Sequence, residues 1–203
     1  MGERAEHVRC FETSVAVWLA GRAEPPEPTA LVTHAVLVEG ASDRAAVLAV
    51  AEGRGRDLAG AGIAVLPMGG AMSVRRFAGL LGPGGLGLPL HGLCDRGEVR
   101  YFSRAGLAMD AVSVCDPDLE GELIRALGVR GVEEVLDAEG DLRLFRTFQQ
   151  QPAQRGRPPA SQLHRFCGTT SGRKEHYARI LTLALPPARI PPPLAELVDA
   201  VCR

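Results

Sequence analysis

Short apolar runs alternate with helix-forming segments through the central part of this chain. Four such runs are found at 34–38, 63–70, 90–98 and 111–124, and the last of them leads into a helix. Continuous apolar runs are typical of strands buried on both faces of a parallel sheet. The segments between them, such as 43–52 and 72–81, favour helices, and the alternation predicts right-handed βαβ crossovers. We therefore expect an α/β fold with a mostly parallel four-stranded sheet flanked by helices.

The two ends of the chain predict additional helices outside this sheet. Residues 1–33 are expected to form one amphipathic helix and a Pro-rich linker, and residues 186–203 a Pro-broken turn followed by a last short helix. The core domain is then 34–185. Within it, the polar, Pro-bearing stretch between Phe145 and His164 predicts a surface loop.

Three of the apolar runs end in an acidic residue, namely Glu39, Asp95 and Asp116. Parallel strands bring their carboxyl ends to one edge of the sheet, which is where open α/β sheets bind ligands. Carboxylates that close repel one another unless cations lie between them. Hard divalent ions such as Mg²⁺ or Mn²⁺ are the natural choice for oxygen ligands.

Further acidic residues follow two of these runs. Asp43 is four residues after Glu39, so both can point at one ion if the turn leads directly into a helix. Asp118, Glu120 and Glu122 lie in the first turns of the predicted helix after Asp116. Their acidity is equally explained by the positive end of the helix dipole, so both interpretations of these three residues stay open.

Composition and charge narrow the class of protein. A chain of 203 residues is long enough for one α/β core with an appendage. No apolar run is long enough to span a bilayer, the amino terminus is charged, and the five cysteines are scattered, so we expect a cytoplasmic protein with reduced thiols and no zinc site.

Charge is unevenly distributed along the chain. Acidic residues outnumber basic ones by twelve to five over 95–141, whereas 142–180 holds seven Arg and one Lys against one Glu. A metal-dependent phosphodiester enzyme needs both kinds of surface, but two solvated faces that segregate by charge would look the same. Arg155 and Arg157, in the predicted loop, are candidates for nucleic-acid contacts or ordinary solvated residues.

The segments VLVEGASD, CDRGE and VCDPDLEGELIRALG together resemble the TOPRIM domain, the Rossmann-like metal-binding fold of topoisomerases, primases and OLD-family nucleases. With the later SGRKEHYA, the chain most resembles the TOPRIM nuclease portion of OLD-family endonucleases, over roughly 34–181. The resemblance implies two divalent metals and a Lys that assists phosphodiester cleavage. The implied catalytic residues are Glu39 and Lys174, and the implied metal ligands are Glu39, Asp43, Asp95, Asp116 and Glu120. Glu98 and Asp118 are further candidate ligands.

One residue departs from the family pattern. TOPRIM domains usually carry Asp-x-Asp at the third strand, whereas this chain has Gly97 at the second position. Either the longer Glu98 reaches the same ion, or one of the two metal positions is weakened. The number of bound ions, one or two, stays open.

Lys174 stands out without any family comparison, because the chain has 22 Arg and this single Lys. A compact ammonium is not interchangeable with a guanidinium beside a scissile phosphate. The segment GTTSGRKE is not a phosphate loop, since its glycine spacing is short and Arg173 stands where the Lys should be. Arg173 is instead a candidate nucleic-acid contact.

The expected function is metal-dependent cleavage or nicking of DNA, or of RNA. Typical OLD proteins attach an ATPase domain to the TOPRIM domain, so this chain is expected to act alone, for example as a homodimer, or with a separate ATPase partner. Two alternatives remain. The chain hydrolyses a small nucleotide or phosphometabolite, or it is an inactive binding or regulatory module, for which Gly97 is the best argument.

Overall fold

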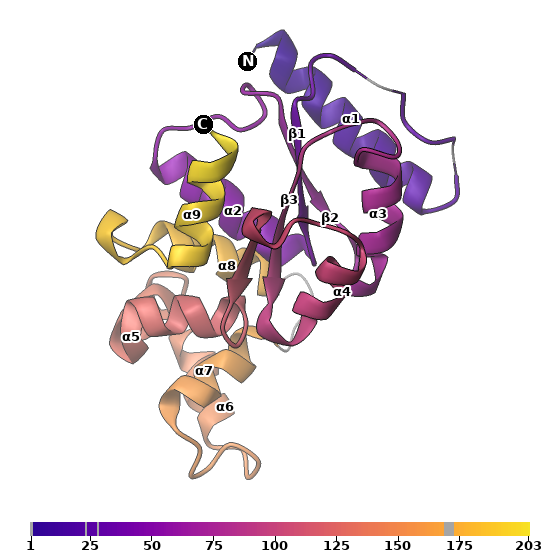
Figure 1. Cartoon of the computed structure of the whole chain (residues 1–203). Helices are drawn as coiled ribbons and strands as arrows, with labels where there is room; N and C mark the ends of the chain where they lie inside the picture. Colours follow the sequence, from indigo (N-terminus) through magenta and orange to yellow (C-terminus); the bar gives the residue numbers. More distant parts are fainter. Residues whose placement is uncertain (1, 23, 28, 169–172) are drawn as a thin grey trace.

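Four parallel strands form one sheet at the centre of the computed structural model, which describes residues 2–22, 24–27, 29–168 and 173–203 (Figure 1). The strands are β1 His34–Val38, β2 Ile63–Pro67, β3 Leu90–Asp95 and β4 Val112–Cys115, in the order β2-β1-β3-β4. Each neighbouring pair is parallel. The predicted α/β fold with a four-stranded parallel sheet is confirmed.

Helices cover both faces of the sheet. One face is covered by α1 Glu3–Leu19, α3 Val74–Leu81 and α4 Val99–Arg104. The other is covered by α2 Ala41–Gly53, α5 Leu119–Ala138, α8 Arg173–Leu183 and α9 Pro192–Val201. Two further helices, α6 Leu142–Gln149 and α7 Pro159–Gly168, extend from α5 at the lower end of the view in Figure 1. Short 3₁₀ turns lie at 71–73, 96–98, 109–111 and 187–189.

Alternate residues of β1 enter the two cores, and this explains its unbroken apolar run. Val36 and Val38 pack under α2 and α5, whereas Ala35 and Leu37 pack under α1 and α3, and all four are fully buried. A strand covered on both faces needs apolar side chains in both directions. Glu39 is the first residue after the buried strand, so its side chain can be charged.

The predicted surface loop between Phe145 and His164 is wrong over half of its length. Helix α6 continues to Gln149 and α7 starts at Pro159, so only 150–158 lie outside these helices. Phe145, Phe148 and Phe166 pack together with ring centroids 5.3 to 6.5 Å apart. Three aromatic side chains thus provide a small core that holds two short helices in an otherwise polar segment.

A pair of charged side chains covers the middle of the free edge of β2, one of the two outer strands. Glu12 of α1 accepts the Val65 N–H through Oε1 at 2.8 Å, and Arg44 of α2 donates from Nε to the Val65 carbonyl at 3.0 Å. The two side chains also form an ion pair of 2.7 Å. Together they satisfy the N–H and the carbonyl of Val65, which an additional strand would otherwise bind.

We expect Glu12→Ala to lower the free energy of unfolding by about 1–3 kcal/mol, because it leaves the Val65 N–H and the Arg44 guanidinium without their acceptor. Urea unfolding measures this change. Glu24→Ala, at an exposed linker position, is the matched control and should stay within about 0.5 kcal/mol of the parent. Equal stability of the two variants would show that the pair contributes nothing to the edge.

Candidate metal centre

Four carboxylates meet where β1 and β3 end, and we call them the strand-end group: Glu39, Asp43, Asp95 and Glu98. Glu39 directly follows β1, and Asp95 is the last residue of β3. Asp43 lies in the first turn of α2, where its Oδ2 accepts the Gly40 N–H at 2.8 Å. This bond closes the turn tightly, as the four-residue spacing from Glu39 predicts. Glu98 enters from the 3₁₀ turn 96–98.

Burial and mutual repulsion raise the pKa values in the strand-end group. Burial raises the pKa of Asp43 to about 6, helped by the charges of Glu120 and Glu39 and opposed by the Gly40 N–H and Lys174. Burial also raises the pKa of Asp95 to about 7, and its acidic neighbours add to this effect. A hydrogen bond with Glu39, together with burial, raises the pKa of Glu98 to about 8. Without a cation, this group therefore retains protons near neutral pH.

A second set of side chains, the helix group, comes from the α5 and α7 helices and consists of Asp118, Glu120 and His164. One ligand atom of each lies within 4.8 Å of the other two. Asp118 caps α5 by accepting the Gly121 N–H at 2.8 Å, and it also binds His164 Nε2 at 2.8 Å. Asp118 thus caps α5 and also faces this site.

Lys174 of α8 connects the two groups. Its Nζ lies 3.3 Å from Glu120 Oε1. Burial lowers the pKa of Lys174, but attraction to Glu120, Asp43 and Asp95 outweighs burial, and the net shift is upward. The ammonium is therefore charged at neutral pH and offsets part of the negative charge.

The helix group and Asp95 of the strand-end group border one open cavity of about 270 Å³. Asp95 comes from the sheet, Asp118, Glu120 and His164 come from the helix group, and Lys174 completes this part of the wall. Because the carboxylates of both groups also act on Asp43 and Asp95 electrostatically, we treat them together as one metal centre.

Asp116 does not join this centre, although β4 ends beside β3. Its carboxylate forms an ion pair of 3.1 Å with Arg96, and 59% of its side chain is exposed. Glu122 is buried and accepts hydrogen bonds from the Asp116 N–H and from Arg125, so it stabilises the start of α5. The expectation that three strand ends supply ligands to one site is thus wrong for Asp116, and the structure brings together only Glu39 and Asp95.

The predicted nucleic-acid contacts lie outside the centre. Arg155 and Arg157 are exposed, and each donates from Nε to a backbone carbonyl, of Gln150 and Ala153 respectively. Arg173 precedes Lys174 and lies 4.0 Å from Asp141.

The donor set fits a hard divalent cation. All but one of its candidate ligands are carboxylates, which suit Mg²⁺ or Mn²⁺. Glu98 Oε2 is buried and accepts no hydrogen bond within the described part of the chain, although its carboxylate lies against that of Glu39. Two adjacent carboxylates need either a shared proton or a cation. Glu98 is thus placed to supply the ligand missing at Gly97.

His164 was not a candidate from the sequence. It is a lone His that lies 46 positions after Asp118, in a segment predicted to be a loop, and no spacing rule joins the two residues. The fold of α7 against α5 brings them together. The centre is therefore an acidic site with one Lys and one His, at the carboxyl edge of a doubly covered parallel sheet.

Comparisons with known proteins define the type of domain. Residues 31–96 match the family model of the overcoming lysogenization defect protein-like TOPRIM domain. This segment is therefore similar to an OLD-like TOPRIM domain, and the resemblance noted in the sequence is confirmed. No curated protein matches the chain in sequence.

Solved structures extend the likeness in fold beyond the matched segment. The C-terminal region of the Burkholderia pseudomallei OLD protein is 21% identical, with a TM-score of 0.61, and the match covers 84% of this chain and 97% of that one. The C-terminal region of the Xanthomonas campestris pv. campestris OLD protein is 23% identical, with a TM-score of 0.62 and coverage of 85% and 96%. The predicted TOPRIM fold is thus confirmed over most of the chain.

Within the described part of the chain, none of the helices combines the length and apolar character required to cross a membrane. The predicted cytoplasmic location, homodimer and separate ATPase partner stay predictions.

We expect the metal-free protein to lose stability as the pH rises from about 4 to about 8. Asp43, Asp95 and Glu98 have raised pKa values, so the folded state binds more protons than the unfolded state over this range, and the free energy of unfolding falls with pH. Mg²⁺ should stabilise the protein more at about pH 8 than at about pH 5, because it replaces the protons.

Urea unfolding in EDTA and in Mg²⁺ measures both effects. Asp95→Asn, which stays neutral, is expected to unfold less readily than the parent in EDTA at the alkaline end of the range and to respond less to Mg²⁺. A metal-free stability that stays level or increases toward alkaline pH would contradict the proposed repulsion.

Proposed function

We propose that this chain is a divalent-metal-dependent nuclease that hydrolyses phosphodiester bonds of nucleic acid. One observation carries the proposal: carboxylates from two strand ends and from α5 share a site with the only Lys of the chain. A cation site with an adjacent fixed ammonium suits the charge of a phosphodiester under attack. The OLD-like TOPRIM domain supports a nuclease-type function.

The carboxylates of the strand-end group and of the helix group are the proposed ligands for Mg²⁺ or Mn²⁺, one ion or two. When bound, such an ion supplies Lewis-acid chemistry and lowers the pKa of a coordinated water. Glu39 and Asp43 project from the rigid junction of β1 and α2. The Gly40 N–H bond to Asp43 fixes one carboxylate oxygen and leaves the other available.

Lys174 is the proposed partner of the phosphate. Its ammonium is the compact charge that neutralises a non-bridging oxygen or gives a proton to the leaving oxygen. Glu120, 3.3 Å away, orients it. Because the net shift in the pKa of Lys174 is upward, the group carries its proton throughout the neutral range.

His164 is a proposed positioning residue for Asp118. A carboxylate only accepts hydrogen bonds, so the bound Nε2 carries the hydrogen while His164 Nδ1 faces away from Asp118. The bond fixes Asp118 between the α5 N-terminus and α7.

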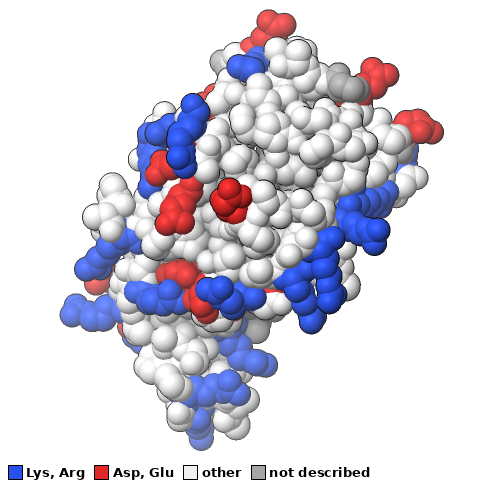
Figure 2. Space-filling view, viewed as in Figure 1, with Lys and Arg blue, Asp and Glu red and all other residues white. Residues whose placement is uncertain are grey.

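Arginines at the lower end of the molecule are the proposed contacts to the phosphate backbone. Figure 2 shows basic side chains gathered there, where Figure 1 places α6 and α7. Arg155 and Arg157 have their Nε groups bound to backbone carbonyls, which directs the remaining guanidinium nitrogens outward. Arg173, beside Lys174, is a third proposed contact. Such contacts position a strand without reading its sequence.

We expect Lys174→Ala to reduce metal-dependent nicking of supercoiled plasmid by about 10²–10³-fold, as removal of one charge-stabilising group does in other hydrolytic sites. Glu39→Gln should reduce it at least as much. Lys174→Arg should restore little activity, because the guanidinium is larger and planar. Agarose gels with Mg²⁺ and with Mn²⁺ give the rates.

Arg179→Ala is the matched control, because Arg179 lies on the same helix but pairs with Glu52 at 2.8 Å outside the centre. It should nick at the parental rate. Hydrolysis of p-nitrophenyl phosphate without nicking would instead support a small-substrate phosphohydrolase. Metal binding without either activity would support a binding module. Each of these two results would overturn the nuclease proposal.

A further inference from the structure

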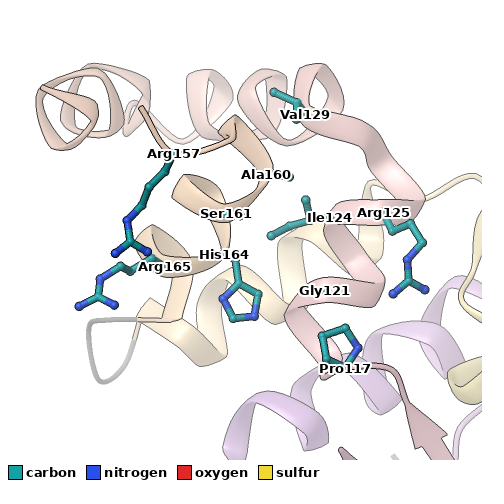
Figure 3. A pocket seen from close by; sticks show the side chains of 10 residues that line it. All are labelled: Pro117, Gly121, Ile124, Arg125, Val129, Arg157, Ala160, Ser161, His164 and Arg165. Carbon is teal, nitrogen blue, oxygen red and sulfur yellow. The ribbon is translucent and has the colours of Figure 1, made fainter. Parts of the chain in front are cut away.

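A second cavity lies between α5 and α7. It is larger than the cavity at the metal centre and lies directly beside it. Its volume is about 550 Å³, within the usual range of small-molecule sites. His164 and Arg165 line this cavity and the metal centre alike, so the two are continuous at these residues. Figure 3 shows the cavity with α5 on one side and α7 on the other.

The lining of this cavity combines apolar and cationic groups. Pro117, Ile124, Val129 and Ala160 supply its apolar surface. The remaining lining residues are Gly121, Ser161, His164 and three arginines, and they include no carboxylate. The lining of this cavity is thus positively charged, whereas the adjoining metal centre is rich in carboxylates.

Two of the arginines are available to a ligand. Arg165 forms no ion pair or hydrogen bond with any described residue, and Arg157 uses only its Nε, at 2.8 Å from the Ala153 carbonyl. Figure 3 shows Arg157 and Arg165 on the same side of the cavity, with Arg125 on the other. Arg125, by contrast, is held by Glu122 at 2.9 Å. Guanidinium groups without acidic partners favour an anion as ligand.

We propose that this cavity, the base pocket, receives one unpaired nucleotide of the strand that is cleaved at the metal centre. The base packs on the apolar surface made by Ile124 and Val129, and its phosphate binds Arg157 and Arg165. This inference rests on the proposed function and names its substrate class. A base can enter the space between α5 and α7 only after leaving its stack, so single strands, flaps and bulges are preferred to intact duplex.

Ser161 offers a substitution that blocks the base pocket alone. It lines the base pocket but not the metal centre, is exposed, and lies in the first turn of α7 away from the core. Ser161→Leu adds an apolar group without charge or an aromatic face. We expect it to weaken binding of a fluorescein-labelled single-stranded oligonucleotide about tenfold, and of the matching duplex less than about twofold, because burying one base on apolar side chains is worth about this factor.

Fluorescence anisotropy with the full chain in Ca²⁺ measures both affinities, and circular dichroism checks the fold. Ser161→Ala, which leaves the cavity open, should bind both oligonucleotides as the parent does. An unchanged single-strand affinity of Ser161→Leu, or an equal loss for strand and duplex, would overturn the base pocket. AMP that displaces the strand as effectively as unlabelled oligonucleotide would also overturn it, because the cavity would then take free nucleotides.

A second pair of variants tests Arg157 and Arg165. Each double variant removes two positive charges, so the two variants have the same net charge. Arg157→Ala/Arg165→Ala should weaken single-strand binding at least about tenfold more than Arg75→Ala/Arg104→Ala. Arg75 and Arg104 are exposed and belong to α3 and α4, on the opposite face of the sheet. Equal losses would show that only overall charge matters, which contradicts a defined pocket.

Cleavage in Mg²⁺ separates this inference from the proposed function. If the parent cleaves nothing but the binding pattern is as expected, the base pocket stands and the nuclease proposal fails. If the parent and Ser161→Leu cleave single strand and duplex alike, the nuclease proposal stands and the base pocket is overturned.

Discussion

Repulsion between gathered carboxylates is the constraint on which the functional edge of this structure depends. Glu39, Asp43 and Asp95 are held close together by rigid backbone, and burial prevents water from screening their charges. Lys174 offsets this repulsion in part, and protons offset more of it. Above neutral pH the carboxylates lose these protons, so the site then favours binding of a multivalent cation.

The fold supplies this constraint through its topology. Strand β1 is central and covered on both faces, so Glu39 can only emerge at the sheet edge, where β3 delivers Asp95 alongside it. Helix α8 then packs against α2 and brings Lys174 to the same edge from far along the chain. Helix α7 packs on α5 and contributes His164 to the metal centre and the wall of the adjoining cationic cavity.

The sheet and half of the site could be predicted because each rests on a local pattern. Buried apolar runs predict β1 and β3, and each run ends at the carboxylate that it presents. Asp116 follows the same rule but turns to Arg96, since the conformation after a strand depends on neighbours that the pattern does not contain. His164 and the helices α6 and α7 depend on long-range packing of aromatic rings, and no spacing in a polar segment indicates it.

The location of bound metal in a crystal tests the central claim most directly. Anomalous diffraction from crystals grown with Mn²⁺ at alkaline pH should give a peak within coordination distance, about 2.2 Å, of oxygens from both the strand-end group and the helix group. An ordered, fully ionised cluster without any peak, or a peak bound by exposed Asp116 rather than by Asp43 and Asp95, would contradict the account.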